Sequence, residues 1–310
     1  MLYYCKTPQG NFGDDLNPWL WPRLAPEVCA EQDPTLFVGI GTILTDKIPS
    51  QPAKVVFGAG SWNTGPLVKI DQRWKIYCVR GPLTAARLGL DPALALVDPA
   101  ILLRRFASPP ARPKYRVSFM PHLQSMPLAD WEALCGQIGF HCIDPRSGVE
   151  RILQELQATE LLLTEAMHGA IVADALRVPW IPVRMYGRFA EFKWQDWSQS
   201  IRVPLKLTDI PPIYAQPPRG WKRLDYLVKK GLAHAGMGRN NWKRLGIRCS
   251  TGNEIDRSLE ALSRVPEKQP AHLSDDKFLS ELEARLLEKL SQLRSDWVKR
   301  PGPLRATIAG

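Results

Sequence analysis

The segment from Leu161 to Trp180 constrains the fold of this chain more than any other stretch. Its apolar start, residues 161–164, is typical of a short buried strand, and the small residues that follow favour a helix that Pro179 ends. His168 therefore lies where a strand gives way to a helix, which in open α/β sheets is where ligands bind. Backbone N–H groups at a helix start favour anions. A partly buried histidine bonded to a backbone carbonyl is the alternative that this spacing leaves open.

Strand-like and helix-like segments alternate through the first 205 residues, which predicts an α/β fold with mostly parallel sheets. A proline-rich stretch over residues 108–113 is typical of a linker. We expect two Rossmann-like domains, residues 1–108 and 114–205, that face each other across a cleft, and then a basic, largely helical extension over residues 206–310. The expected strands are 36–40, 54–58, 75–79, 94–97, 115–120, 140–143, 161–164 and 180–183; the expected helices include 81–88, 128–138, 149–156 and 275–298, the last with Ser274 as N-cap.

Positive charge is concentrated toward the end of the chain. Residues 1–205 hold 21 Lys and Arg against 19 Asp and Glu, whereas residues 206–310 hold 20 against 12. Nine of these cations lie within residues 216–250, where Arg219 to Ala235 can form a helix with Trp and Leu opposite Lys and Arg. Such a helix is typical of a membrane interface, so an anionic membrane surface is an expected partner. A helix packed on the protein's own core is the alternative, and nucleic acid is not expected because no recognised binding module surrounds the segment.

Cysteine spacing and hydropathy exclude several classes of protein. The six cysteines are scattered and form no CxxC pair, which argues against a zinc site and against a disulfide framework. The first residues lack the basic and apolar regions of a signal peptide, and no run of about 18 apolar residues occurs to span a membrane. We therefore expect a cytoplasmic protein without a dedicated metal site.

Glycine and polar residues follow several of the expected strands, where a bare backbone can approach a ligand closely or simply form a tight turn. Arg80 ends a strand just before a helix, where its guanidinium can hold a carboxylate or phosphate, or pair with a structural acid. His122 ends a strand in the second run and can reach the same cleft as His168. Asp98 is a candidate carboxylate partner that the sequence alone does not place. The further candidate binding residues are Asn11, Asp14, Gly41, Thr42, Gly60 and Glu165.

In combination these motifs resemble the polysaccharide pyruvyl transferase family, in particular its exopolysaccharide, succinoglycan-type members. The resemblance implies two Rossmann-like domains like those of the glycosyltransferase-B class. The stretches that carry it occur in consistent order within residues 1–203, and they are 11–14, 39–42, 58–60, 79–84, 98–100, 120–122, 165–179 and 192–197.

The resemblance also implies a reaction. A pyruvyl group would pass from phosphoenolpyruvate, as donor substrate and without any further cofactor, to a sugar residue of a polysaccharide precursor as a ketal. The implied acceptor is a sugar or a lipid-linked oligosaccharide, so the enzyme would be cytoplasmic and peripheral on the inner membrane. His168 is then implied as the acid/base or a phosphate ligand, Arg80 as a clamp on the donor, and Asp14 as a residue toward the sugar.

One position departs from the family pattern. Many relatives carry an arginine two residues before the motif histidine, where this chain has Ala166, so that anion contact is either missing or supplied by Arg184 or Arg188. Two other functions stay open at this stage. One is a nucleotide-sugar glycosyltransferase on the same architecture, and the other is a membrane-peripheral scaffold that keeps an inactive transferase fold.

Overall fold

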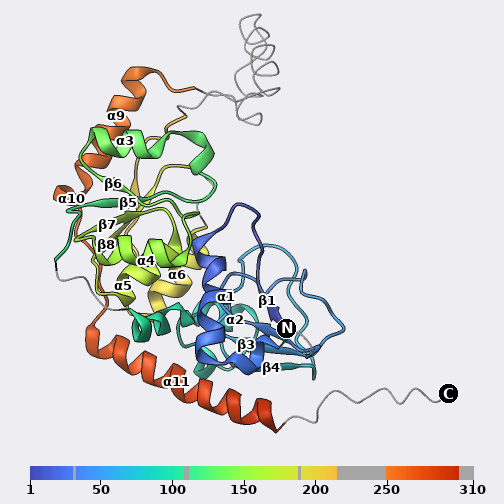
Figure 1. The fold of residues 1–310 in the computed structure, drawn as a ribbon. Coiled ribbons are helices and arrows are strands. Elements are labelled where there is room, and N and C mark those ends of the chain that lie inside the picture. The colour runs from blue at the N-terminus through green and yellow to red at the C-terminus, as the bar shows by residue number, and fades with distance from the viewer. Residues whose placement is uncertain (31–32, 108–111, 188–189, 215–248, 300–310) are drawn as a thin grey trace, which may run out of the picture.

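Two parallel β-sheets organise the part of the chain that the computed structural model describes, which is residues 1–30, 33–107, 112–187, 190–214 and 249–299. Every pairing between the named strands is parallel, so the expected α/β fold with two parallel sheets is confirmed (Figure 1). The first sheet contains, in spatial order, β1 (Leu2–Tyr3), β2 (Leu36–Val38), β3 (Lys54–Phe57) and β4 (Trp74–Cys78). The second contains, in spatial order, β6 (His141–Cys142), β5 (Ser118–Met120), β7 (Leu162–Thr164), β8 (Trp180–Arg184) and β9 (Thr208–Asp209).

Helices connect and cover these strands, as α/β topology requires for parallel sheets. The α-helices are α1 (Phe12–Leu24), α2 (Pro82–Arg87), α3 (Trp131–Gln137), α4 (Val149–Gln157), α5 (Met167–Ala175), α6 (Glu191–Ser200), α9 (Gly252–Ser263), α10 (Val265–Lys268) and α11 (Asp276–Val298). Four short 3-10 helices accompany them: η1 (Pro26–Cys29), η2 (Pro92–Leu94), η3 (Pro99–Phe106) and η4 (Met126–Leu128).

One hydrophobic core runs through both halves of the molecule. It joins Phe37 of β2, in the first sheet, to Leu162 of β7, in the second. The halves meet where α5 packs on η3 and where α1 packs on α4 and α5. Burying one such apolar side chain contributes about 1.5–3 kcal/mol, so pulling the halves apart would be costly. The division into domains at residues 1–108, 114–205 and 206–310 stays a prediction.

Helix α1 was not predicted from the sequence because it contains Pro18 and Pro22. An interior proline removes a backbone donor and disfavours a helix. Burial outweighs that penalty here, since one side of α1 enters the core. The Asn17 side chain also fixes the helix to the end of β2, because it donates to the carbonyl of Ile40 and accepts from its N–H, both at 2.9 Å. The buried apolar residues of α1 are Phe12, Leu16, Leu20, Trp21 and Leu24.

Helix α11 runs along the lower edge of both halves in Figure 1. Its buried stripe packs on the chain's own core and consists of Leu279, Leu282, Leu286, Leu290, Leu293 and Trp297. Near its end, Asp296 accepts from Lys75 at 2.6 Å and from Tyr77 at 2.7 Å. Its N-cap is Asp275, so the expectation of Ser274 was wrong. The Ser274 hydroxyl donates instead to the buried carboxylate of Asp174.

Two further differences from the sequence analysis have local causes. The expected strand over residues 94–97 was wrong. Asp91 accepts a hydrogen bond from the N–H of Ala93 at 2.9 Å and starts the 3-10 helix η2. Among the described residues, this segment keeps only an isolated bridge between Val79 and Ala95. Strands β1 and β9 were missed because two residues give no readable period. Helices α6 and α9 were not predicted either.

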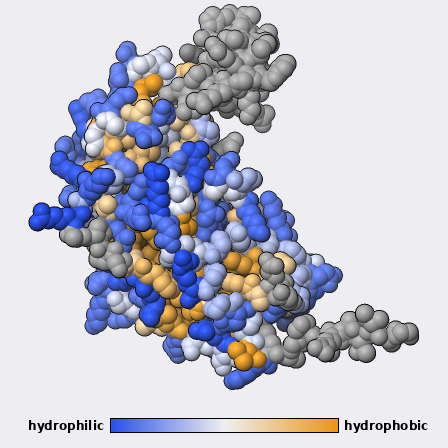
Figure 2. All heavy atoms as spheres, viewed as in Figure 1, coloured by the Kyte–Doolittle hydropathy of each residue, from blue (hydrophilic) through white to orange (hydrophobic). Residues whose placement is uncertain are grey.

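The surface in Figure 2 is mostly hydrophilic, with apolar side chains gathered between α1 and α11. A hollow of about 930 Å³ lies there, and its apolar lining includes Leu24, Phe106, Leu287 and Leu290. No helix among the described residues is both long and apolar enough to cross a membrane. The expected amphipathic helix from Arg219 to Ala235 lies outside the described residues, as do all nine cations of the basic cluster.

Candidate active site

His168 reaches from the second half of the molecule into the first. Its Nε2 lies 3.5 Å from Oδ2 of Asp98, within ion-pair distance, and neither of these buried atoms has a hydrogen-bond partner. The Asp98 side chain is fully buried, and its Oδ1 accepts from the N–H of Ala100 at 3.0 Å, which fixes the carboxylate at the start of η3. A carboxylate so placed favours a proton on Nε2 of His168 and leaves Nδ1 as the basic nitrogen. The pair therefore has the geometry of an oriented acid/base.

The bare backbone of Gly13 makes room for this imidazole. A Cβ on Gly13 would lie 2.2 Å from Nδ1 of His168, so a side chain at this position would displace the ring. The next residue, Asp14, accepts a hydrogen bond from the Asn11 amide. Burial raises the pKa of Asp14, while the Asn11 hydrogen bond and the charge of His168 act in the opposite direction. The start of α1 thus brings a glycine, a carboxylate and an amide to the His168 ring.

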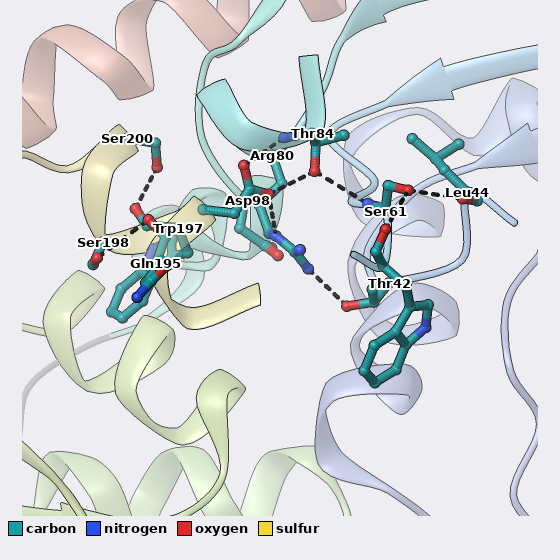
Figure 3. Close-up of polar contacts among 12 residues, drawn as sticks. Thr42, Leu44, Ser61, Arg80, Thr84, Asp98, Gln195, Trp197, Ser198 and Ser200 are labelled. Carbon is teal, nitrogen blue, oxygen red and sulfur yellow. Dashed lines mark hydrogen bonds and ion pairs between the residues drawn. The ribbon is translucent and has the colours of Figure 1, made fainter. Parts of the chain in front are cut away.

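Arg80 is enclosed rather than open to solvent. Its side chain is fully buried, with Nε 3.1 Å from Oδ2 of Asp196 and Nη1 2.8 Å from Oγ1 of Thr42. Figure 3 shows the guanidinium extending from Arg80 toward Thr42. A Cβ on Gly60 would lie 2.2 Å from Cζ of Arg80, so this glycine is needed for the guanidinium to fit. Arg80 therefore pairs with an internal acid, and its use as a donor clamp stays a prediction.

Asp196 joins helix α6 to the start of helix α2. Besides Arg80, its carboxylate accepts from the N–H of Thr84 at 2.9 Å and from the Thr84 hydroxyl at 2.6 Å. Gly81 permits this contact, because a Cβ there would lie 2.1 Å from the backbone oxygen of Asp196. The interaction brings α6, which follows the second sheet in the chain, against the first half of the molecule.

Lys193 lies one turn before Asp196 on α6 and was not predicted as a site residue. It is half-buried, with Nζ 6.0 Å from the centre of the Trp62 ring. Burial and, next, the charge of Arg80 lower its pKa to about 8, while the charge of Asp14 acts in the opposite direction. These influences show that Lys193 lies within the electrostatic reach of both of those side chains. The only sequence signal was the resemblance of residues 192–197, which assigns no role to any single residue.

His122 and Glu165 lie at the carboxyl ends of the second sheet. His122 accepts at Nδ1 from the N–H of Gln124 at 3.2 Å, and burial followed by the charge of Lys193 lowers its pKa to about 4. Glu165 is buried and accepts from the N–H groups of His122 and Met185, each at 3.2 Å. Burial raises the pKa of Glu165. The Glu165 carboxylate therefore joins the ends of β5 and β8, while His122 is uncharged near pH 7.

Helix α5 begins at Met167, and its N-cap, Ala166, provides no side-chain hydrogen bond to the helix start. Its first N–H groups are candidate anion donors, because the opening N–H groups of a helix have no intrahelical partner. Arg184, one of the two expected substitutes for the missing arginine, pairs with Asp209 at 2.6 Å on the surface. Arg188 lies outside the described residues. Gly41, with φ of 129°, adopts a backbone conformation that favours glycine, and it precedes Thr42 in the loop that receives Arg80.

Within the described part of the chain, no group of three or more His, Cys, Asp or Glu side chains is arranged to hold a metal ion.

Comparison with known proteins places this chain in a family. The family model described as polysaccharide pyruvyl transferase matches residues 33–185. The succinoglycan biosynthesis protein ExoV of Rhizobium meliloti (strain 1021) is 40% identical over 214 residues, which cover 67% of each chain. The chain therefore belongs to the polysaccharide pyruvyl transferase family, and it is an enzyme of that family.

A solved structure of the wall teichoic acid polymerase TagF is also similar, over 84% of this chain and 73% of its own, with 10% identity and a TM-score of 0.34. At that score the likeness carries no conclusion about either fold or function.

Proposed function

We propose that this enzyme transfers the pyruvyl group of phosphoenolpyruvate to two hydroxyls of one sugar in a lipid-linked polysaccharide precursor, and releases phosphate. Family membership and the identity with a succinoglycan biosynthesis protein support the class of reaction. The structural observation that supports the catalytic mechanism is the His168–Asp98 pair. Its imidazole lies beside a buried carboxylate and against Gly13 at the start of α1.

The reaction balances without an oxidant, a reductant or a metal. A proton adds to the methylene carbon of phosphoenolpyruvate, and positive charge develops at the carbon that carries the phosphate. One sugar hydroxyl attacks that carbon and loses its proton. The C–O bond to phosphate then breaks, and a second hydroxyl closes the cyclic ketal and gives up its proton, which leaves with the phosphate. The proton transfers at carbon and at the two hydroxyls are the steps that a positioned acid/base accelerates.

His168 is suited to those transfers. Asp98 fixes its Nε2, so Nδ1 is the nitrogen that exchanges a proton with the donor methylene or with the attacking hydroxyl. Positioned acid–base catalysis of this kind contributes about 10²–10⁴-fold. Asp14, whose pKa is raised by burial, directly follows Gly13 in the chain and is assigned to the sugar hydroxyls. Asn11 holds Asp14 in place.

Product identity tests the proposal. The purified enzyme is incubated with phosphoenolpyruvate and a membrane extract that contains the lipid-linked acceptors, and in parallel with nucleotide sugars. The proposal predicts phosphate release and an acid-labile pyruvyl ketal on the saccharide. Release of a nucleotide from a nucleotide sugar, with no phosphate from phosphoenolpyruvate, would make the chain a glycosyltransferase. Failure to turn over either donor would leave the inactive scaffold as the better account.

A further inference from the structure

We propose that Lys193, and not Arg80, is the cation that binds the anionic donor. This inference rests on the proposed function and deepens it, because it identifies the residue that recognises the phosphate or carboxylate of phosphoenolpyruvate.

Arg80 is poorly available for this task. A guanidinium recognises a carboxylate or phosphate through two parallel N–H donors that must reach the ligand. The Arg80 side chain has no exposed surface, its Nε is committed to Asp196 and its Nη1 to Thr42. Its buried Nη2 has no partner, but by itself it does not offer the two parallel donors of a clamp. The Asp196 carboxylate also offsets the charge of Arg80 inside the protein. A second anion would have to displace this internal partner and open the contact between α6 and α2.

Lys193 occupies the adjacent turn of α6 without those restraints. Residues three apart on a helix share a face, so Lys193 and Asp196 lie on the same side of α6. That side faces the first half of the molecule, because Asp196 bonds to the start of α2 there. Lys193 is half-buried but not enclosed. Among the described residues, no carboxylate lies within ion-pair distance of its Nζ, and its recorded contact is with the ring of Trp62 at 6.0 Å.

The charges around Lys193 come from three separate elements. Arg80 lies between β4 and α2, Asp14 belongs to α1, and His122 follows β5. Lys193 interacts electrostatically with all three, so it lies centrally among the candidate site residues. His122, whose pKa is about 4, is neutral near pH 7 and adds no competing charge. A partly desolvated ammonium without its own carboxylate attracts an anion more strongly than a surface lysine does.

In this arrangement two groups have separate roles. The His168–Asp98 pair transfers protons, and Lys193 binds the multiply charged donor beside it. Trp62 is 39% exposed and provides an apolar wall on which the ammonium rests. Lys193 on α6 also restores a cation to a site in which the residue before Met167 is alanine.

Substitution of Lys193 tests the proposal with two variants and a control. Lys193→Met removes the charge at similar length, Lys193→Arg keeps it, and Lys277→Met removes an exposed lysine of α11. A charged hydrogen bond is worth about 1.5–3 kcal/mol, so Lys193→Met should raise KM for phosphoenolpyruvate about 10- to 100-fold. Lys193→Arg should recover most of that loss, and Lys277→Met should not differ from wild type. Thermal melting confirms that each variant is folded.

Calorimetric binding of phosphoenolpyruvate, with inorganic phosphate as a second probe, is measured on the same variants. Weaker binding by Lys193→Met alone supports the proposal. Wild-type binding and wild-type KM in Lys193→Met overturn it, even if pyruvyl transfer is established. If the wild-type enzyme transfers no pyruvyl group, the proposed function fails, yet the calorimetry still decides whether Lys193 binds this anion. A Lys193→Met variant that lowers only kcat would also contradict a donor-binding role.

Discussion

Removing the carboxylate of Asp196 should destabilise the protein severely. The ion pair with Arg80 has no exposed surface on either side, and the same carboxylate accepts two hydrogen bonds from Thr84. Breaking a buried pair by deleting one partner costs about 3–5 kcal/mol, because the other charge stays buried without compensation. Each unsatisfied donor of Thr84 would cost about 1–3 kcal/mol by itself, but such terms overlap and are not summed. We therefore expect Asp196→Ala to lose about 3–5 kcal/mol of unfolding free energy.

Urea denaturation, followed by tryptophan fluorescence, measures this loss. Because one hydrophobic core joins both halves, a single transition is expected, and a shift of its midpoint reports the change in stability. Asp209→Ala is the matched control, since it breaks the exposed pair with Arg184 and should cost about 0–1 kcal/mol. A cost for Asp196→Ala as small as that of the control would refute the reasoning. Such a result would mean that Arg80 does not depend on Asp196 as its partner. Arg80 could then bind the donor, and the reason for assigning donor binding to Lys193 would be lost.

Three more outcomes follow from the site. Asp98→Asn should lower kcat about 10²-fold with little effect on KM for phosphoenolpyruvate in steady-state kinetics, since the amide orients His168 less well than a carboxylate does. Gly13→Ala should slow phosphate release far more than Gly136→Ala, because only the first Cβ would strike the His168 ring, at 2.2 Å, whereas the second meets open space. KM for phosphoenolpyruvate should rise above a pH of about 8, where Lys193 loses its proton, and Lys193→Arg should remove that rise in a pH series.

The position of His168 could be predicted from the sequence because it depends on local signals alone. An apolar strand, a run of small residues and a terminating proline fix a strand–helix junction within residues 161–179, and the structure has that junction between β7 and α5. Most other strands of the two sheets were predicted within a few residues for the same reason. The partner of His168 was not predictable from the sequence. Asp98 belongs to the other half of the molecule and reaches His168 only because η3 packs on α5.

The environment of Arg80 shows the same limit. A strand-end arginine before a helix is equally compatible with a ligand and with an internal acid, and the acid, Asp196, lies far along the chain. Only the docking of α6 on α2 decides between them. Lys193 was missed because a lysine in a tryptophan-rich segment is usually a solvated residue, and nothing local indicates that Asp196 anchors the next turn. Tertiary contacts, rather than local sequence propensities, therefore determine which charged side chains of the site are paired and which can bind a ligand.

The most direct test of the central claim compares phosphate release from phosphoenolpyruvate, in the presence of acceptor, by the wild-type enzyme and by His168→Gln. His141→Gln is the matched control, because His141 also lies 3.5 Å from a carboxylate, that of Glu155, but beside the start of β5 rather than at the site. We expect His168→Gln to lose about 10²–10⁴-fold in turnover, and we expect His141→Gln to keep the wild-type turnover. Wild-type turnover by a folded His168→Gln enzyme would contradict the account.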